Sequence, residues 1–320
     1  MNRPQRRFVA VVGVILVVPT GLGIVAATER RAPSPTFSDE RFRDTFFDSA
    51  TEAIRGQRPR LGQPPQPSDN RAVSGREPSA RDESASATSK SPFTDLISPT
   101  SLEDEIKRVR LEFDAAITTP TAFRSGDFQQ ARLHLTTLAA LFAVVVEHEG
   151  DVRWKADAAA ARDLFARSAA NCKSGSAQVY NETKLRKADL EDLVSGSGLA
   201  DRQAELENDW GLIADRVPLM TYADRLLEGP LKEGTRDAEA IESLGDRVRR
   251  TAELLAMVGQ ILKTDGLADA DDADYAELCD ELITASRSVS LALDRQDAEA
   301  VRRGAGAVSQ SCSKCHESYR

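Results

Sequence analysis

The stretch TRDAEAIESLGDRVRRTAELLAMVGQILK, residues 235–263, decides the fold class of this chain. Its apolar residues recur at intervals of three, four and seven: Ile241, Leu244, Val248, Leu255 and Leu262. This spacing places them in a single stripe along an α-helix. A stripe of this length has to be buried against partner helices, so the stretch predicts a helical bundle.

The same helical pattern extends to both sides of this stretch. From residue 101 onward, helical patterns alternate with brief Gly, Ser and Pro breaks, and no alternating run indicates strands. The chain is therefore predicted to be all-α. The expected helices cover residues 102–118, 127–148, 152–173, 176–194, 200–227, 235–263, 273–293 and 298 to the C-terminus. Short connections make neighbouring helices antiparallel, which predicts two four-helix bundles in tandem, 101–198 and 199–320.

The first 28 residues predict either a signal peptide or a membrane anchor. Arg3, Arg6 and Arg7 precede a run without charge, residues 8–27. A cleaved signal and a transmembrane helix both fit this length. Either alternative places the rest of the chain outside the cytoplasm, in the periplasm, as a soluble or a membrane-tethered protein.

Residues 29–100 have the composition of a disordered linker. They are rich in Pro, Ser, Arg and Gly and lack a core pattern, apart from residues 39–54. That exception is either a short amphipathic helix that docks on a later domain or a transient helix. The net charge of −9 excludes nucleic acid as an expected partner, because phosphate backbones repel acidic proteins.

One motif carries chemistry: Cys312-Ser313-Lys314-Cys315-His316. It has the CxxCH spacing of c-type haem attachment, in which two cysteines form thioethers to the porphyrin and the histidine ligates the iron. On a helix, residues three and four apart lie on one face, so the three side chains can meet one flat ligand. Haem c, with its iron, is therefore the expected cofactor.

Three other interpretations of the motif are weaker. A thioredoxin-like dithiol belongs to an α/β fold, which this sequence does not predict. A structural zinc ion needs a fourth ligand, and no second cysteine pair lies nearby. Coincidence is improbable for a five-residue pattern in a chain with four cysteines and three histidines.

The C-terminal sequence CSKCHESYR, residues 312–320, resembles the end of class II c-type cytochromes, the cytochrome c′ family. The resemblance covers residues 200–320 and implies a four-helix bundle with the motif in its last helix. It also implies that Arg320, four residues after His316, lies beside the haem on the histidine side.

The resemblance also bears on the sixth iron position. In that family the first helix of the bundle carries an arginine and, four residues later, the side chain facing the open side of the haem; Arg216 and Met220 have this spacing. Methionine ligation would suit electron transfer. Pro218 would kink or restart the helix where Met220 must be aimed. If Met220 only packs, the iron is five-coordinate and open to small gases; Met257 is the remaining and weaker candidate.

Other cysteines and histidines are expected to be structural. His134 and His148 are about 21 Å apart along one helix and cannot share a metal ion. Both are therefore expected to be partly exposed structural residues, and haem or metal binding in the first bundle is the weaker alternative.

Cys172 and Cys279 are either a disulfide that joins the bundles or two buried thiols. Asp269, Asp271, Asp272 and Asp274, around the start of the helix predicted from residue 273, are expected to cap that helix rather than bind calcium.

These observations predict a c-type cytochrome that transfers one electron at a time to a redox partner protein of unknown identity. The alternative is a haem protein that binds nitric oxide or carbon monoxide at five-coordinate iron. A haem enzyme is the weakest interpretation, because the sequence offers no distal acid–base pair.

Overall fold

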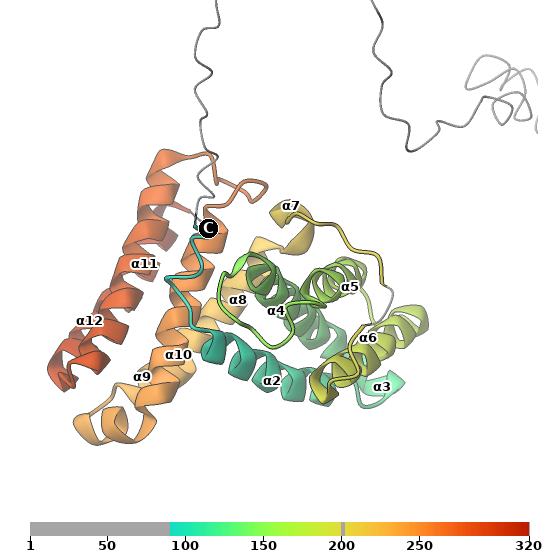
Figure 1. Ribbon diagram of the computed structural model, residues 1–320, viewed down its shortest axis with the longest axis horizontal. Helices are drawn as coiled ribbons and strands as arrows, with labels where there is room; N and C mark the ends of the chain where they lie inside the picture. Colours follow the sequence, from blue (N-terminus) through green and yellow to red (C-terminus); the bar gives the residue numbers. More distant parts are fainter. Residues whose placement is uncertain (1–89, 200–201, 320) are drawn as a thin grey trace, which may run out of the picture. The chain divides into compact units, whose positions relative to one another are not determined.

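The computed structural model describes residues 90–199 and 202–319, and within these ranges every regular element is a helix (Figure 1). The all-α prediction is therefore confirmed for this part of the chain. The predicted signal or anchor and nearly all of the predicted linker lie outside the described residues.

The first group of helices lies close to its predicted positions. It comprises α2 (Pro99–Ala116), α4 (Phe128–Glu147), α5 (Ala158–Asn171) and α6 (Ala177–Ser195), with the short helix α3 (Pro120–Ala122) and the π-helical turn η2 (Phe123–Asp127) between α2 and α4. The start of α5 was predicted six residues too early. Helix α4 is central, since it packs against α2, α5 and α8.

The second group consists of α7 (Trp210–Ile213), α8 (Arg216–Leu226), the π-helical turn η3 (Leu227–Leu231), α9 (Lys232–Gly234), α10 (Ala238–Leu262), α11 (Ala273–Asp294) and α12 (Ala298–Ser318). Helices α10, α11 and α12 pack side by side, and α8 packs between α10 and α4 (Figure 1). Three of the long helices were predicted within three residues at both ends.

The prediction of one helix over residues 200–227 was wrong. Residues 202–209 are not helical, and the backbone has an extended conformation at Ala214 and Asp215, just before α8 begins. Pro218 is the third residue of α8, where its missing N–H group would have had no acceptor within the helix. The proline therefore restarts the helix instead of kinking it.

Side-chain caps fix where several helices begin. The side chains of Ser98, Ser176, Asp237, Asp272 and Asp297 each accept a hydrogen bond from a backbone N–H in the first turn of the following helix. The capping role expected for Asp272 is confirmed. Asp297 caps α12, the helix that carries the CxxCH motif.

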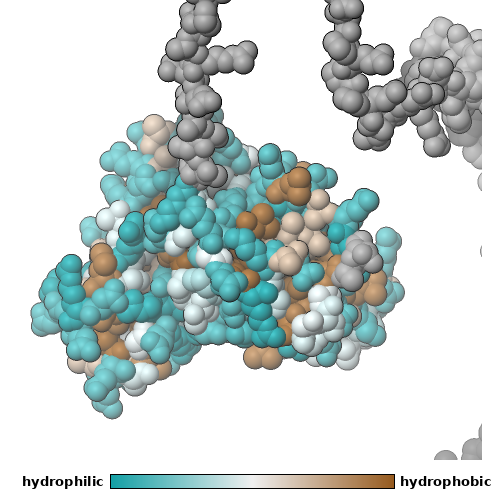
Figure 2. Space-filling model, in the orientation of Figure 1, coloured by the Kyte–Doolittle hydropathy of each residue, from teal (hydrophilic) through white to brown (hydrophobic). Residues whose placement is uncertain are grey.

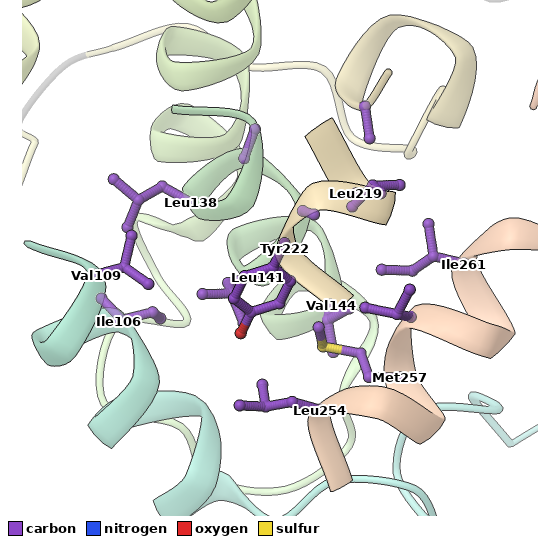
Figure 3. Close-up of a cluster of buried hydrophobic side chains, with 14 of the residues drawn as sticks. Ile106, Val109, Leu138, Leu141, Val144, Leu219, Tyr222, Leu254, Met257 and Ile261 are labelled. Atoms are coloured by element: carbon purple, nitrogen blue, oxygen red, sulfur yellow. The ribbon is translucent and has the colours of Figure 1, made fainter. Parts of the chain in front are cut away.

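A single hydrophobic core joins the two groups of helices. Figure 3 shows its central part, where Ile106 and Val109 of α2 meet side chains from α4, α8 and α10. Met257 is only 1% exposed in this cluster and is a core residue. The helical segment Pro120–Glu147, which includes α4, is long and apolar enough to span a membrane, but 78% of its most apolar 18-residue stretch is buried inside the protein.

The packed region begins before residue 101. Phe93, Leu96 and Ile97 are buried, although the sequence assigned them to the linker. The N–H and hydroxyl groups of Ser98 both donate to Glu253 on α10, which ties this segment to the second group of helices. Most of the surface on the face in Figure 2 is hydrophilic, and its apolar patches are separate.

Candidate functional site

The CxxCH motif lies in the last two turns of α12. Cys312 and Cys315 are partly buried and pack against the core, and both are free thiols. Ser313 and Lys314 between them are exposed, and Lys314 pairs with Glu281 of α11. Because the two cysteines are three residues apart, the helix turns both sulfur atoms toward the protein.

His316 is exposed at the next position of the helix. It follows Cys312 by four residues, which puts it about 40° around the helix axis from that cysteine. Arg320, expected beside a haem, lies outside the described residues.

Helix α8 faces the two cysteines. Burial raises the pKa of Cys315, and the positive charge of Arg216 opposes this rise. The pKa of Cys312 is also raised, mainly by burial and also by Cys315 and by the negative charge of Asp224. Arg216 therefore acts near Cys315 and Asp224 near Cys312.

Met220 lies between these two charged residues on α8. Positions 216, 220 and 224 follow one another at intervals of four and share one face of a helix. The charges on either side of Met220 act on Cys315 and Cys312, so this part of α8 lies near the thiol pair. Met220 itself is partly buried and packs against the core.

Helix α11 contributes a third thiol and a tyrosine to this region. Cys279 is buried, and burial together with the nearby Cys315 raises its pKa to about 12. The ring of Tyr275, one turn earlier, lies under the guanidinium of Arg216 at 6.0 Å from the ring centroid. Arg216 also forms an ion pair with Asp269.

Tyr319 closes the same region from the end of α12. Its ring meets that of Tyr275 edge-on, with 5.0 Å between the centroids, and its hydroxyl donates a 2.9 Å hydrogen bond to Asp272. Neither tyrosine was predicted to be a site residue. A usable signal was that Tyr319 follows Cys315 by four residues and that Tyr275 precedes Cys279 by four, which puts each on the face of a cysteine.

No disulfide joins Cys172 and Cys279, which was the weaker of the two alternatives for this pair. Both cysteines are buried and free, and the thiol of Cys172 donates to the backbone carbonyl of Phe128. Cys279 lies near Cys315 instead. The two residues fit the alternative interpretation, in which each is a small buried side chain.

His134 and His148 are structural, but they are buried rather than partly exposed as predicted. The N–H of Gly150 donates to Nδ1 of His148, so Nε2 carries the proton and donates to the carbonyl of Ile97 at 2.9 Å. Nε2 thus holds the segment before α2, and Nδ1 holds the loop that follows α4. His134 instead lines a polar cavity between α2, α4, α8 and α10.

Among the described residues, no group of three or more His, Cys, Asp or Glu side chains is placed to hold a metal ion. The two thiols and the imidazole of α12 could serve a group that brings most of its own metal ligands.

Comparisons with protein-family models, with curated proteins and with solved structures found no match for this chain.

Proposed function

We propose that this protein is a c-type cytochrome that carries one covalently bound haem and transfers single electrons outside the cytoplasm. The observation that carries the proposal is the placement of two free, partly buried thiols, Cys312 and Cys315, on the inner face of α12, with His316 at the next helical position. In this proposal the helices of residues 199–320 form the haem-bearing bundle of the tandem pair.

The chemistry of the donor set supports a haem over a bare metal ion. A zinc site needs about four protein ligands, whereas haem iron already has four porphyrin nitrogens and takes one or two from the protein. Two cysteines would hold the porphyrin edge and His316 would ligate the iron. A bound haem would supply one-electron chemistry between ferrous and ferric iron.

The position of the motif disfavours a catalytic dithiol. Reactive CxxC thiols lie near helix N-termini, where the helix dipole lowers the cysteine pKa. Here the motif is at the C-terminal end of α12, and burial raises the pKa of both Cys312 and Cys315. Protonated thiols at this place suit a permanent thioether bond better than disulfide exchange.

Residues around the motif have distinct proposed roles. Met220 is the proposed second axial ligand, because it lies on α8 between Arg216 and Asp224, whose charges act on the thiol pair. Arg216 places a positive charge there, held by Asp269 and by the ring of Tyr275. Arg320 is proposed to lie beside the haem on the side of His316.

A second function rests on Met220 itself. Its side chain packs against the core. If it keeps these contacts, the iron has an open sixth position, and the protein would bind nitric oxide or carbon monoxide. Electron transfer remains the first proposal, with a redox partner protein, with no catalytic activity of its own and with residues 1–28 as the export signal or membrane tether.

Covalent attachment is tested by expressing the full chain in a bacterial host that matures c-type cytochromes. We expect haem to stay on the polypeptide in a denaturing gel, and this signal to be lost in a Cys312→Ser, Cys315→Ser double variant. The matched control is Cys172→Ser, a free thiol of the first group of helices. A wild-type chain that stays colourless would refute the proposal.

The sixth ligand is tested by absorption spectra of the oxidised and reduced protein, with and without carbon monoxide. A low-spin spectrum that ignores the gas and becomes high-spin in Met220→Leu supports electron transfer. The control is Met257→Leu, which makes the same change in the core. A high-spin ferrous protein that binds carbon monoxide would instead support the second function.

A further inference from the structure

A polar cavity of about 170 Å³ lies between α2, α4, α8 and α10, and it shares no residue with the CxxCH site. Four arginines line it: Arg108, Arg225, Arg247 and Arg250. Since one water occupies roughly 30 Å³ of liquid, the cavity has room for several waters or for one small anion.

The two carboxylates that line the cavity already accept hydrogen bonds from side chains of the protein. Glu105 is buried and accepts hydrogen bonds from Arg108 and from the hydroxyl of Tyr222. Glu112 accepts from the remaining guanidinium nitrogen of Arg108. Arg108 is therefore saturated by two carboxylates.

The other three arginines have more capacity to bind an anion. Arg225 donates to the neutral amide of Gln130. Arg247 and Arg250 each pair with a partly exposed carboxylate outside the cavity, Glu233 and Asp104. Solvent-exposed pairs of this kind are weak, so these guanidinium groups can share their charge with a ligand inside the cavity.

The pKa of His134 indicates the sign of the electrostatic field in the cavity. Its imidazole is buried in the cavity wall, with Glu112 at 3.7 Å. Burial lowers the pKa of His134 to about 4, and the positive charges of Arg225 and Arg108 add to this effect. The arginines of α8 and α2 thus outweigh the neighbouring carboxylate at this point.

We propose that the cavity binds a small oxyanion, a phosphate or a carboxylate, through Arg225, Arg247 and Arg250, with His134 in the wall. Planar guanidinium groups donate in a fork that matches both kinds of oxyanion. An anion would also offset the positive charges around His134, so it should favour the protonated imidazole. This binding is independent of haem.

The experiment follows the three histidine side chains of the full chain by NMR while inorganic phosphate, succinate or chloride is added at constant ionic strength. We expect phosphate or succinate to shift the His134 resonances saturably and to raise its pKa, whereas chloride and the His148 resonances serve as references. The stronger of the two oxyanions identifies the class. Absence of a saturable shift at His134 with either oxyanion would overturn the proposal.

Variants separate binding from unspecific charge effects. Arg225→Gln should weaken oxyanion binding about tenfold or more, because it removes a charged hydrogen-bond donor. Arg303→Gln makes the same charge change at an exposed ion pair on α12 and should leave binding unchanged. Equal weakening in both variants would show that only the net charge matters and would contradict the proposal. Circular dichroism confirms that each variant keeps its helices.

Discussion

Tyr222 on α8 donates a 2.7 Å hydrogen bond from its hydroxyl to Glu105 on α2, a carboxylate that is 1% exposed. Arg108 donates to both oxygens of the same carboxylate. Burial and the charge of Glu105 raise the pKa of Tyr222, so its hydroxyl stays protonated and acts as the donor. This triad joins α8 to α2 and thereby fixes the helix that carries Met220.

Tyr222→Phe should lower the free energy of unfolding by about 1–2 kcal/mol, because it leaves a buried carboxylate with one donor fewer. Urea denaturation followed by circular dichroism measures this change. Tyr180→Phe is the control, since the recorded contact of that residue is ring packing against Phe123. Equal losses in the two variants would argue against a special role of the hydrogen bond.

Acid should destabilise the protein through His134. Its pKa in the folded state is about 4, below the ordinary value of 6.5, so the unfolded chain binds more protons between these values. The stability is therefore complete above about pH 6.5 and falls as the pH drops toward 4, by up to about 3 kcal/mol.

The measurement is urea denaturation in a buffer without phosphate or carboxylate, at several pH values. His134→Gln should flatten the dependence between pH 6.5 and 4. An unchanged slope in His134→Gln would locate the acid sensitivity elsewhere.

Local signals predicted most of the helices but not the start of α8. Helices with long apolar stripes can be predicted from helical periodicity alone. The helix with the stripe from Ile241 to Leu262 was predicted within three residues at both ends. The interruption before Arg216 depends on residues 202–215, which contain no complete stripe of their own. Pro218 marked the right place, and its position in the first turn explains the restart.

Contacts between distant segments could not be predicted. Tyr275, Tyr319 and Asp272 meet only because α11 and α12 pack together, and no motif in the sequence pairs them. Burial of His148 likewise depends on residues 90–98 folding back over α4. The CxxCH motif was found because its meaning is contained in five consecutive residues.

The close packing of α11 and α12 predicts opposite effects for two glycines of α12. A Cβ atom on Gly304 would lie 2.9 Å from both Ser288 Oγ and Val289 Cγ2, whereas one on Gly306 would meet no atom within 4 Å. Gly304→Ala should lower the free energy of unfolding by about 1–2 kcal/mol through overpacking. Gly306→Ala should raise it by about 0.5–1 kcal/mol, because alanine favours the helix.

Thermal denaturation of both glycine variants checks this prediction. If Gly304→Ala were also stabilising, α11 and α12 would be free to move apart around Gly304.

Thiol reactivity should divide the four cysteines into two pairs before any haem is attached. Burial raises the pKa of Cys172 to about 11 and that of Cys279 to about 12, so at pH 8 almost no thiolate forms at either position, and solvent does not reach them. Cys312 and Cys315 are partly exposed and should react with iodoacetamide at least about tenfold faster, as measured by peptide mass spectrometry at timed intervals.

Denaturation in urea is the control, because it should make all four rates equal. In the mature protein the modification of Cys312 and Cys315 should disappear while Cys172 and Cys279 can still be labelled after unfolding; labelling of all four would mean that no thioether had formed.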